Sequence, residues 1–217
     1  MEWWLLAGLS AEEVREVLAL ARRRRFSRGE VVFHQDDPAE SVHLIAKGRF
    51  AIRSITPVGD VATIAVRGPG ECFGELALVD DYAHRVATVA ALEEGETFVL
   101  LHTEFRRLRG EHPRVEDALV RFLVNEVRTL NMRLLEALFL PVERRVRRRL
   151  VELARLYPSA DGGTLITLTQ EVIAELAGAS RATVNQVLRE EEKRGTLELT
   201  RGSTRIIDLE SLEQRAR

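Results

Sequence analysis

The chain has 217 residues, with 45% hydrophobic residues, 30% charged residues and a net charge of -2. This length allows one large domain or two modest ones, and the composition is that of an ordinary globular protein. The near-neutral charge excludes a wholly basic nucleic-acid binder, and a single cysteine, Cys72, excludes an internal disulfide, a four-thiolate zinc site and an iron-sulfur cluster. Because no apolar run approaches a membrane span and the start lacks a basic leader, we expect a cytoplasmic protein without membrane contact.

The first half of the chain predicts one helix followed by short strands. Ser10 and Glu13 form a capping-box pattern, and apolar residues then recur at helical spacing, which predicts a helix over residues 10–25. From Phe26 to about Leu101, short apolar stretches alternate with glycine, proline and aspartate turn signals. This spacing predicts an antiparallel barrel or jelly roll, and we assign residues 1–112 to that domain.

A long helix is predicted after Pro113, over residues 113–140. Its apolar positions are separated by steps of three and four residues: Leu119, Leu123, Val127, Leu130, Leu134 and Ala137. A seam of this kind suits pairing with a second copy of the helix, and the alternative is that it packs on its own barrel. Pro141 breaks the helix, so we assign residues 141–217 to a separate domain.

The segment 169–195 has the pattern of a helix-turn-helix. Thr169 and Ser180 can cap two successive helices, small Ala174 allows a close crossing, and Gly178 can adopt the positive φ of the turn. The exposed positions of the second helix carry side chains that bond base edges, and a two-stranded wing that can meet phosphate follows. The predicted DNA-binding residues are Thr169, Ser180, Arg181, Ala182, Thr183, Asn185, Gln186, Arg189, Arg201 and Ser203. The alternative is a helical hairpin with solvated polar residues.

Charge is distributed unevenly along the chain. Residues 141–217 hold 14 basic and 12 acidic side chains, whereas residues 1–140 hold 18 and 22. The arginine-rich run 144–149 is compatible with a phosphate-binding patch or with a solvated helix face. The arginines at 22–25 lie in the acidic part, where we expect a solvated face.

A ligand-binding cassette is predicted between the last strands of the barrel. Gly74 followed by a short helix would turn the backbone amides of Glu75 and Leu76 outward, and Arg85 can return beside them. Such a cradle suits one compact anion, and Glu75 could accept a sugar hydroxyl, so a phosphate that bears a ribose fits. The alternative is a salt bridge between Glu75 and Arg85 that closes an empty cassette.

With these motifs the chain resembles the Crp/Fnr family of transcription factors, the relatives of the cyclic-AMP receptor protein. The resemblance covers residues 10–210 and rests on Gly29-Glu30, Gly48, Gly70, the segment 73–76, Arg85 with Ala87, and Ser180, Arg181, Thr183 and Val184. It implies an α+β fold. An N-terminal antiparallel β jelly roll of the cyclic-nucleotide-binding type would precede a long dimerisation helix and a C-terminal winged helix-turn-helix.

The resemblance also implies an effector and partners. By this resemblance, the cyclic phosphate of cyclic AMP would contact Gly74 and the backbone amides of Glu75 and Leu76. The ribose 2′-hydroxyl would bond Glu75, and Arg85 would balance the charge of the phosphate. A backbone amide from Ala87 and base contacts near Leu130 and Asn131 would complete the site. The expected assembly is a homodimer on near-palindromic double-stranded DNA, with RNA polymerase as a further partner.

Some positions depart from the cyclic-AMP-binding pattern of that family. Val86 stands where a serine or threonine is usual, and Leu130 offers the base only apolar contact. Loss of one neutral hydrogen bond costs about 0.5 to 1.5 kcal/mol, so we expect weaker binding rather than none. In the second helix, Ala182 and Gln186 replace an acidic residue and an arginine, so the operator should differ.

Other function classes account for fewer of these residues. The five histidines show no paired spacing, so no metal site is predicted, with His84 as a residual haem-ligand alternative. Cys72 is expected to be buried rather than catalytic, and we expect no enzyme. Two alternatives to an effector-controlled DNA-binding regulator stay open. One is a regulator that binds DNA without a cyclic nucleotide, and the other is a cyclic-nucleotide module that binds no DNA.

Overall fold

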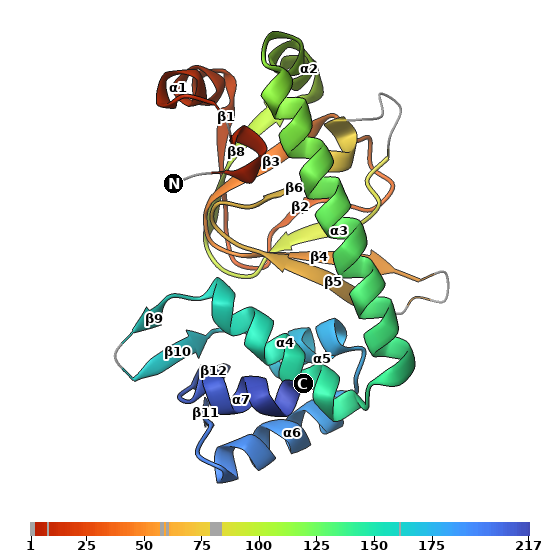
Figure 1. Ribbon diagram of the computed structural model, residues 1–217, viewed down its shortest axis with the longest axis vertical. Coiled ribbons are helices and arrows are strands. Elements are labelled where there is room, and N and C mark those ends of the chain that lie inside the picture. The colour runs from red at the N-terminus through yellow and green to blue at the C-terminus, as the bar shows by residue number, and fades with distance from the viewer. Residues whose placement is uncertain (1–2, 8, 57–58, 60, 79–83, 161) are drawn as a thin grey trace. The chain divides into compact units, whose positions relative to one another are not determined.

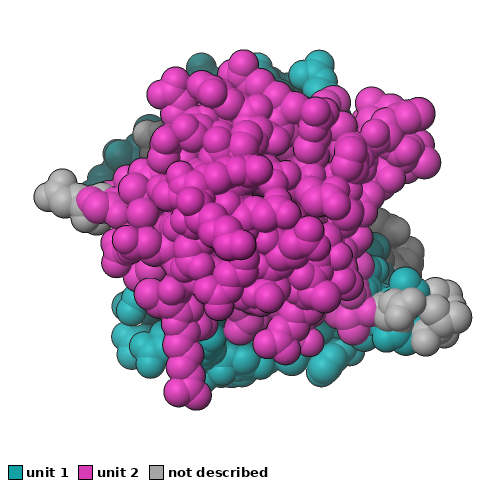
Figure 2. Space-filling model, turned by 90° about the horizontal axis from the view of Figure 1, so that it is seen from below, with its two compact units in different colours: residues 1–60, 65–130 teal, residues 61–64, 131–217 magenta. Residues whose placement is uncertain are grey.

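The computed structural model describes residues 3–7, 9–56, 59, 61–78, 84–160 and 162–217 (Figure 1). The chain divides into two compact units, Met1–Asp60 with Ala65–Leu130 and Val61–Ile64 with Asn131–Arg217 (Figure 2). No helix in the described ranges is long and apolar enough to cross a membrane.

The first unit is built around two antiparallel four-stranded sheets. One has the order β1-β8-β3-β6 and the other β2-β7-β4-β5. This arrangement is the predicted antiparallel jelly roll. The strands are β1 (Arg22–Phe26), β2 (Val31–Phe33), β3 (Ser41–Lys47), β4 (Phe50–Ile55), β5 (Val61–Arg67), β6 (Cys72–Phe73), β7 (Thr88–Ala91) and β8 (Gly95–Leu101). The short helix η2 (Glu75–Leu78) follows β6.

Helices close one side of the jelly roll. Phe50 and Ile45 lie in the core between the sheets, whereas Leu100 and Phe105 belong to a second apolar cluster that the helices cover. Trp3 anchors the N-terminal segment in that cluster and donates a hydrogen bond from Nε1 to the carbonyl of Ile45 at 3.0 Å. The helices of this part are η1 (Trp4–Leu6), α1 (Ala11–Leu20), α2 (His102–Glu111) and α3 (Pro113–Phe139).

The first predicted helix is shorter than its sequence pattern indicated. The capping box of Ser10 and Glu13 is present, but α1 ends at Leu20. Residues 22–25 instead form the edge strand β1, where Arg22 pairs with Val99 and Arg25 with Glu96 of β8. The prediction of helix to residue 25 was wrong because backbone pairing with β8 overrides the favourable intrinsic helix propensity of arginine.

Helix α3 has the predicted length, but its apolar seam has two different environments. Leu119 is buried, and Leu123 packs beside it against the apolar cluster of the first unit. Farther along, Val127, Leu130 and Leu134 are more than half exposed, at 57%, 51% and 58%. Packing on the chain's own barrel therefore accounts only for the start of the seam.

The second unit contains the helix-turn-helix and a larger sheet than expected. The predicted two-stranded wing, β11 (Leu197–Thr200) and β12 (Ser203–Ile206), belongs to a four-stranded sheet of order β11-β12-β10-β9. The additional strands are β9 (Ser159–Ala160) and β10 (Gly163–Ile166), which the sequence analysis did not predict. The helices are α4 (Val142–Leu156), α5 (Gln170–Ala177), α6 (Arg181–Lys193) and the unpredicted α7 (Leu209–Ala216).

Gly163 allows β10 to approach β12 closely. Its φ is +105°, and a Cβ added there would lie 2.1 Å from the carbonyl oxygen of Ile206. We expect Gly163→Ala to lower the free energy of unfolding by roughly 1 to 3 kcal/mol, measured by chemical denaturation. Gly110→Ala is the matched control, because nothing lies within 4 Å of a Cβ there and residue 110 is helical. The control should stabilise by about 0.5 to 1 kcal/mol, and equal effects of the two changes would contradict this account.

Candidate functional site: an effector cassette and a DNA-reading surface

The cassette predicted from the sequence is a close packing of Gly74 against Arg85. Gly74 follows β6 and has a φ of +80°, in the left-handed region that favours glycine. A Cβ at this position would lie 2.6 Å from Nη1 of Arg85 and 3.0 Å from the carbonyl oxygen of Ser41. A side chain at position 74 would therefore displace the arginine.

Arg85 is held inside the first unit by neutral groups. It is 6% exposed, and Nη1 donates to the carbonyl oxygens of Ser41 at 2.8 Å and Gly74 at 3.4 Å. Nη2 donates to the hydroxyl of Ser41 at 3.1 Å, and the guanidinium carbon lies 4.0 Å from the centre of the Phe33 ring. Nε has no hydrogen-bond partner among the described residues. Burial lowers the pKa of Arg85, although Asp37 and other nearby carboxylates oppose that shift.

Glu75 is the acidic member of the cassette and begins η2. Burial raises the pKa of its carboxyl, and the positive charges of Arg67 and Arg85 act in the opposite direction. The ion pairs recorded among the described residues do not include one between Glu75 and Arg85, so a salt bridge does not close the cassette. The carboxylate instead stays close to Arg85 without direct contact.

The other predicted cassette residues differ in exposure. Ala87 is 4% exposed, Leu76 is 36% exposed and Val86 is 63% exposed, so Val86 presents an apolar side chain at the surface beside Arg85. Leu130 and Asn131 both lie exposed on α3. Residues 79–83, between η2 and Arg85, are outside the described ranges.

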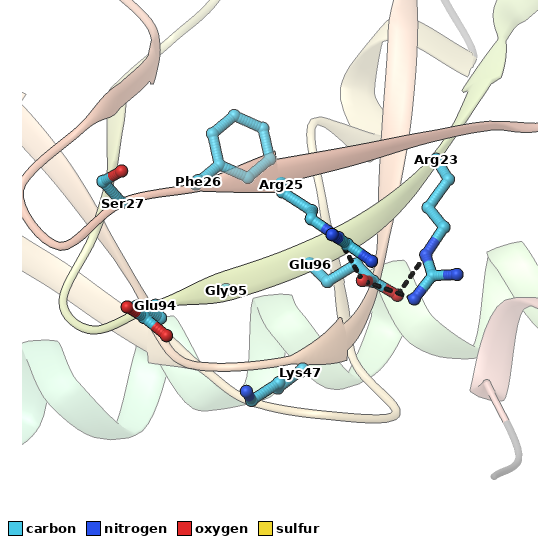
Figure 3. A pocket seen from close by; sticks show the side chains of 8 residues that line it. All are labelled: Arg23, Arg25, Phe26, Ser27, Lys47, Glu94, Gly95 and Glu96. Atoms are coloured by element: carbon cyan, nitrogen blue, oxygen red, sulfur yellow. Dashed lines mark hydrogen bonds and ion pairs between the residues drawn. The ribbon is translucent and has the colours of Figure 1, made fainter.

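A separate cavity of about 540 Å³ lies at the edge of the jelly roll. It is lined by β1, the end of β3 and the start of β8 (Figure 3). Glu96 points toward Arg23 and Arg25, at 2.6 Å and 3.3 Å, and the pKa of its carboxyl is lowered, mainly by the hydrogen bond from Arg23. Residues 22–25 are exposed, as expected for a solvated face. Glu96, which the sequence analysis did not single out, neutralises part of this charge.

The helix-turn-helix is capped as the sequence predicted. The hydroxyl of Thr169 accepts from the amide of Val172 at 3.4 Å, and that of Ser180 accepts from Thr183 at 3.0 Å. Gly178 has a φ of 57° and ends α5 in the left-handed region. These contacts set the angle at which α6 leaves the turn.

The exposed side of α6 contains all five residues predicted to face bases, which we call the reading face: Arg181, Ala182, Asn185, Gln186 and Arg189. Two of them already have partners on their own helix. Gln186 donates to Glu190 at 3.2 Å, and Arg189 pairs with Glu192 at 2.8 Å. At the tip of the wing Arg201 is exposed, and the hydroxyl of Ser203 lies 2.5 Å from that of Thr200.

Two members of the arginine run 144–149 fit neither a phosphate-binding patch nor a solvated face. Arg147 and Arg149 are 8% and 3% exposed. Arg147 bonds the carboxylate of Glu191, and Arg149 bonds that of Glu136. Both sequence interpretations were wrong for these two residues, because each is buried against a carboxylate of another helix.

The remaining sequence predictions concern Cys72 and metals. Cys72 is buried, and burial raises the pKa of its thiol well above the usual value, which makes it a poor nucleophile. Within the described part of the chain, no group of three or more histidine, cysteine, aspartate or glutamate side chains could hold a metal ion.

Comparison with known proteins identifies both parts of the chain. Residues 23–112 match the cyclic nucleotide-binding domain, and residues 144–215 match the Crp-like helix-turn-helix domain. The chain is 33% identical over 195 residues to a CRP-like cAMP-activated global transcriptional regulator of Mycobacterium tuberculosis, covering 88% of this chain and 87% of that protein. It is 31% identical over 210 residues to the cyclic AMP receptor protein of Thermus thermophilus, covering 97% and 95%.

Solved structures show the same architecture. The catabolite activator protein of Thermus thermophilus aligns over 98% of both chains, with 30% identity and a TM-score of 0.58. CLP of Xanthomonas campestris, described as a c-di-GMP responsive global regulator, aligns over 91% of this chain and 99% of its own, with 22% identity and a TM-score of 0.77. The chain therefore belongs to the Crp/Fnr family and is a DNA-binding transcription regulator with a cyclic nucleotide-binding domain, not an enzyme.

Proposed function

We propose that this regulator is a homodimer whose affinity for operator DNA is set by cyclic AMP bound in the cassette. In this proposal residues 1–112 sense the effector, residues 113–140 join two copies, and residues 141–217 read DNA in the cytoplasm, with RNA polymerase as a partner. The observation that carries the proposal is Arg85, a buried cation whose contacts are neutral and whose Nε lacks a partner among the described residues.

The residues of the cassette fit a cyclic nucleotide. Bound cyclic AMP would supply a phosphate anion and a ribose hydroxyl. Arg85 would offset the charge of the anion, Gly74 has no side chain that would displace the guanidinium, and Glu75 is an acceptor for the hydroxyl. Two relatives named for cyclic AMP, at 33% and 31% identity, support this choice of effector.

The exposed apolar side chains of α3 support the dimer. Val120, Val124, Val127, Leu134 and Leu138 are all between 45% and 64% exposed, and they follow one another at helical spacing. Asn131 lies between Val127 and Leu134 at the same spacing. Apolar stripes of this size are normally covered by a partner, and a second copy of α3 supplies a matching surface.

Two-fold symmetry then shapes the operator. A dimer presents two copies of the reading face, so we propose a near-palindromic site with half-sites about one helical turn, roughly 34 Å, apart. Thr169, Ser180 and Thr183 would approach phosphates, and Arg181, Asn185 and Gln186 would contact base edges.

The alternative is a regulator that binds DNA without a cyclic nucleotide. Arg85 is already bonded to Ser41 and Gly74, and the exposed Val86 offers no hydrogen bond to a ligand. CLP, a relative in fold, is described as responsive to a different nucleotide. Effector titration separates these two functions.

Arg85→Ala should weaken cyclic AMP binding by tenfold or more, because a hydrogen bond to a charged group is worth about 1.5 to 3 kcal/mol. Val86→Thr should strengthen it by up to roughly tenfold, because the new hydroxyl can donate. Calorimetric titration measures both, and Arg23→Ala, an exposed arginine of the same domain, is the control. Unchanged affinity in Arg85→Ala would refute the cassette.

Leu134→Lys should convert the dimer to monomer, because it places a charge in the middle of the apolar stripe. Thr129→Lys adds the same charge off the stripe and should leave the dimer intact. Sedimentation measures the assembly, and we expect the dissociation constant of Leu134→Lys to rise by at least about tenfold. A wild-type monomer, or equal effects of the two changes, would rule out pairing through α3.

Arg181→Ala should relax base preference at one position and cost roughly 1 to 3 kcal/mol of binding free energy. Arg201→Ala should weaken all sequences similarly and reduce the salt dependence by about one phosphate contact. Operator selection followed by salt-dependent binding assays measures both. Sequence-independent losses of equal size in the two variants would contradict the assignment of α6 as the recognition helix.

A further inference from the structure

The recognition helix α6 has a charged residue at a position where its pattern predicts an apolar one. Val184, Val187 and Leu188 face the interior and are fully buried, and the next position on that face is Glu191. No part of Glu191 is exposed. A carboxylate placed there costs several kcal/mol unless other groups compensate its charge.

Three arginines compensate it, and we call this group the Glu191 cluster. Arg147 of α4 donates from Nε to Oε1 at 2.8 Å, and Arg194 donates to the same oxygen at 2.8 Å. Arg215 of α7 donates from Nε and Nη2 to Oε2, at 3.1 Å and 2.8 Å. Although burial raises the pKa of Glu191, the bonds from Arg147 and Arg215 outweigh it, and the pKa is lowered.

The same cluster holds the base of the wing. Nη2 of Arg215 also donates to the hydroxyl of Thr196 at 2.5 Å. The backbone of Thr196 bonds the carbonyl of Glu191 at 3.0 Å and accepts from Ile207 at 2.9 Å, where the hairpin closes. One buried carboxylate therefore connects α4, α6, α7 and the wing.

We propose that Glu191 is a positioning residue for DNA recognition, which fixes the rotation of α6 and its place relative to the wing through Arg147 and Arg215. Base-edge hydrogen bonds require accurate placement of the reading face, whereas attraction to phosphates tolerates displacement. Loss of the Glu191 cluster therefore lowers discrimination between operator and random DNA more than it lowers the affinity for DNA of any sequence. The inference rests on the recognition helix proposed above.

The test separates positioning from stability by an all-apolar replacement, Arg147→Met/Glu191→Leu/Arg215→Met. Replacing a buried ionic cluster by apolar residues of similar volume is often neutral or stabilising, so we expect an unchanged or higher midpoint of thermal unfolding. We also expect the ratio of affinities for a selected operator and a random duplex to fall by about tenfold or more. The operator is selected by the wild-type dimer with cyclic AMP present.

The control and a second variant keep the outcome decisive. Arg155→Met/Glu213→Leu removes another pair between α4 and α7, at 2.9 Å but with side chains 65% and 34% exposed, and should leave the ratio unchanged. If the triple variant does not fold, Arg215→Lys tests the proposal instead. This change keeps the positive charge but loses the two-nitrogen contact with Oε2 of Glu191. It should lower the operator-to-random affinity ratio at an almost unchanged midpoint of thermal unfolding. A folded variant that keeps the wild-type ratio overturns the proposal. A wild-type protein that selects no operator overturns the recognition helix as well.

Discussion

In the first unit, the proposed effector cassette depends on the buried charge of Arg85. Among the described residues, its guanidinium donates to neutral oxygens of Ser41 and Gly74, and the carboxylates of Asp37 and Glu40 act on it through space. An ion removed from water is costly until a counter-charge reaches it. A compact anion would supply that charge, and the absence of a side chain at Gly74 lets the guanidinium pack against the backbone of the cassette.

Buried arginines in the second unit show the opposite case. Arg149 bonds Glu136 and Glu152, and Arg147 bonds Glu190 and Glu191, so each meets two carboxylates. Because these carboxylates already balance the two positive charges, an anion from solution would gain little electrostatic energy by binding there. Burial of an arginine alone therefore does not indicate a ligand site. The decisive quantity is how far the protein's own carboxylates balance the charge, and by that criterion Arg85 differs from the arginines of α4.

The sequence predicted the elements whose signals are local. Capping by Ser10, Thr169 and Ser180 and the left-handed turn at Gly178 depend on neighbouring residues, and all are present. Strand β1 was predicted as helix because its partner β8 lies about 70 residues away along the chain, beyond any periodic pattern. The pairing of Arg147 with Glu191 was missed for the same reason, because 44 residues separate the two along the chain. Glu191 was detectable, since it interrupts the apolar face of α6.

In the proposed homodimer, control of DNA binding by an effector would place an energetic demand on the assembly. Helix α3 contributes residues to both units, the first up to Leu130 and the second from Asn131, so it connects the cassette domain to the DNA-binding domain. A switch from about 1% to 99% of the active state needs roughly 5.5 kcal/mol of differential binding, whereas one hydrogen bond to a charged group supplies about 1.5 to 3. Two cassettes acting on one shared equilibrium would reduce the demand on each to about half. In the proposed function, pairing through α3 and control by a small ligand therefore support one another, because a shared transition divides the required differential binding between two cassettes.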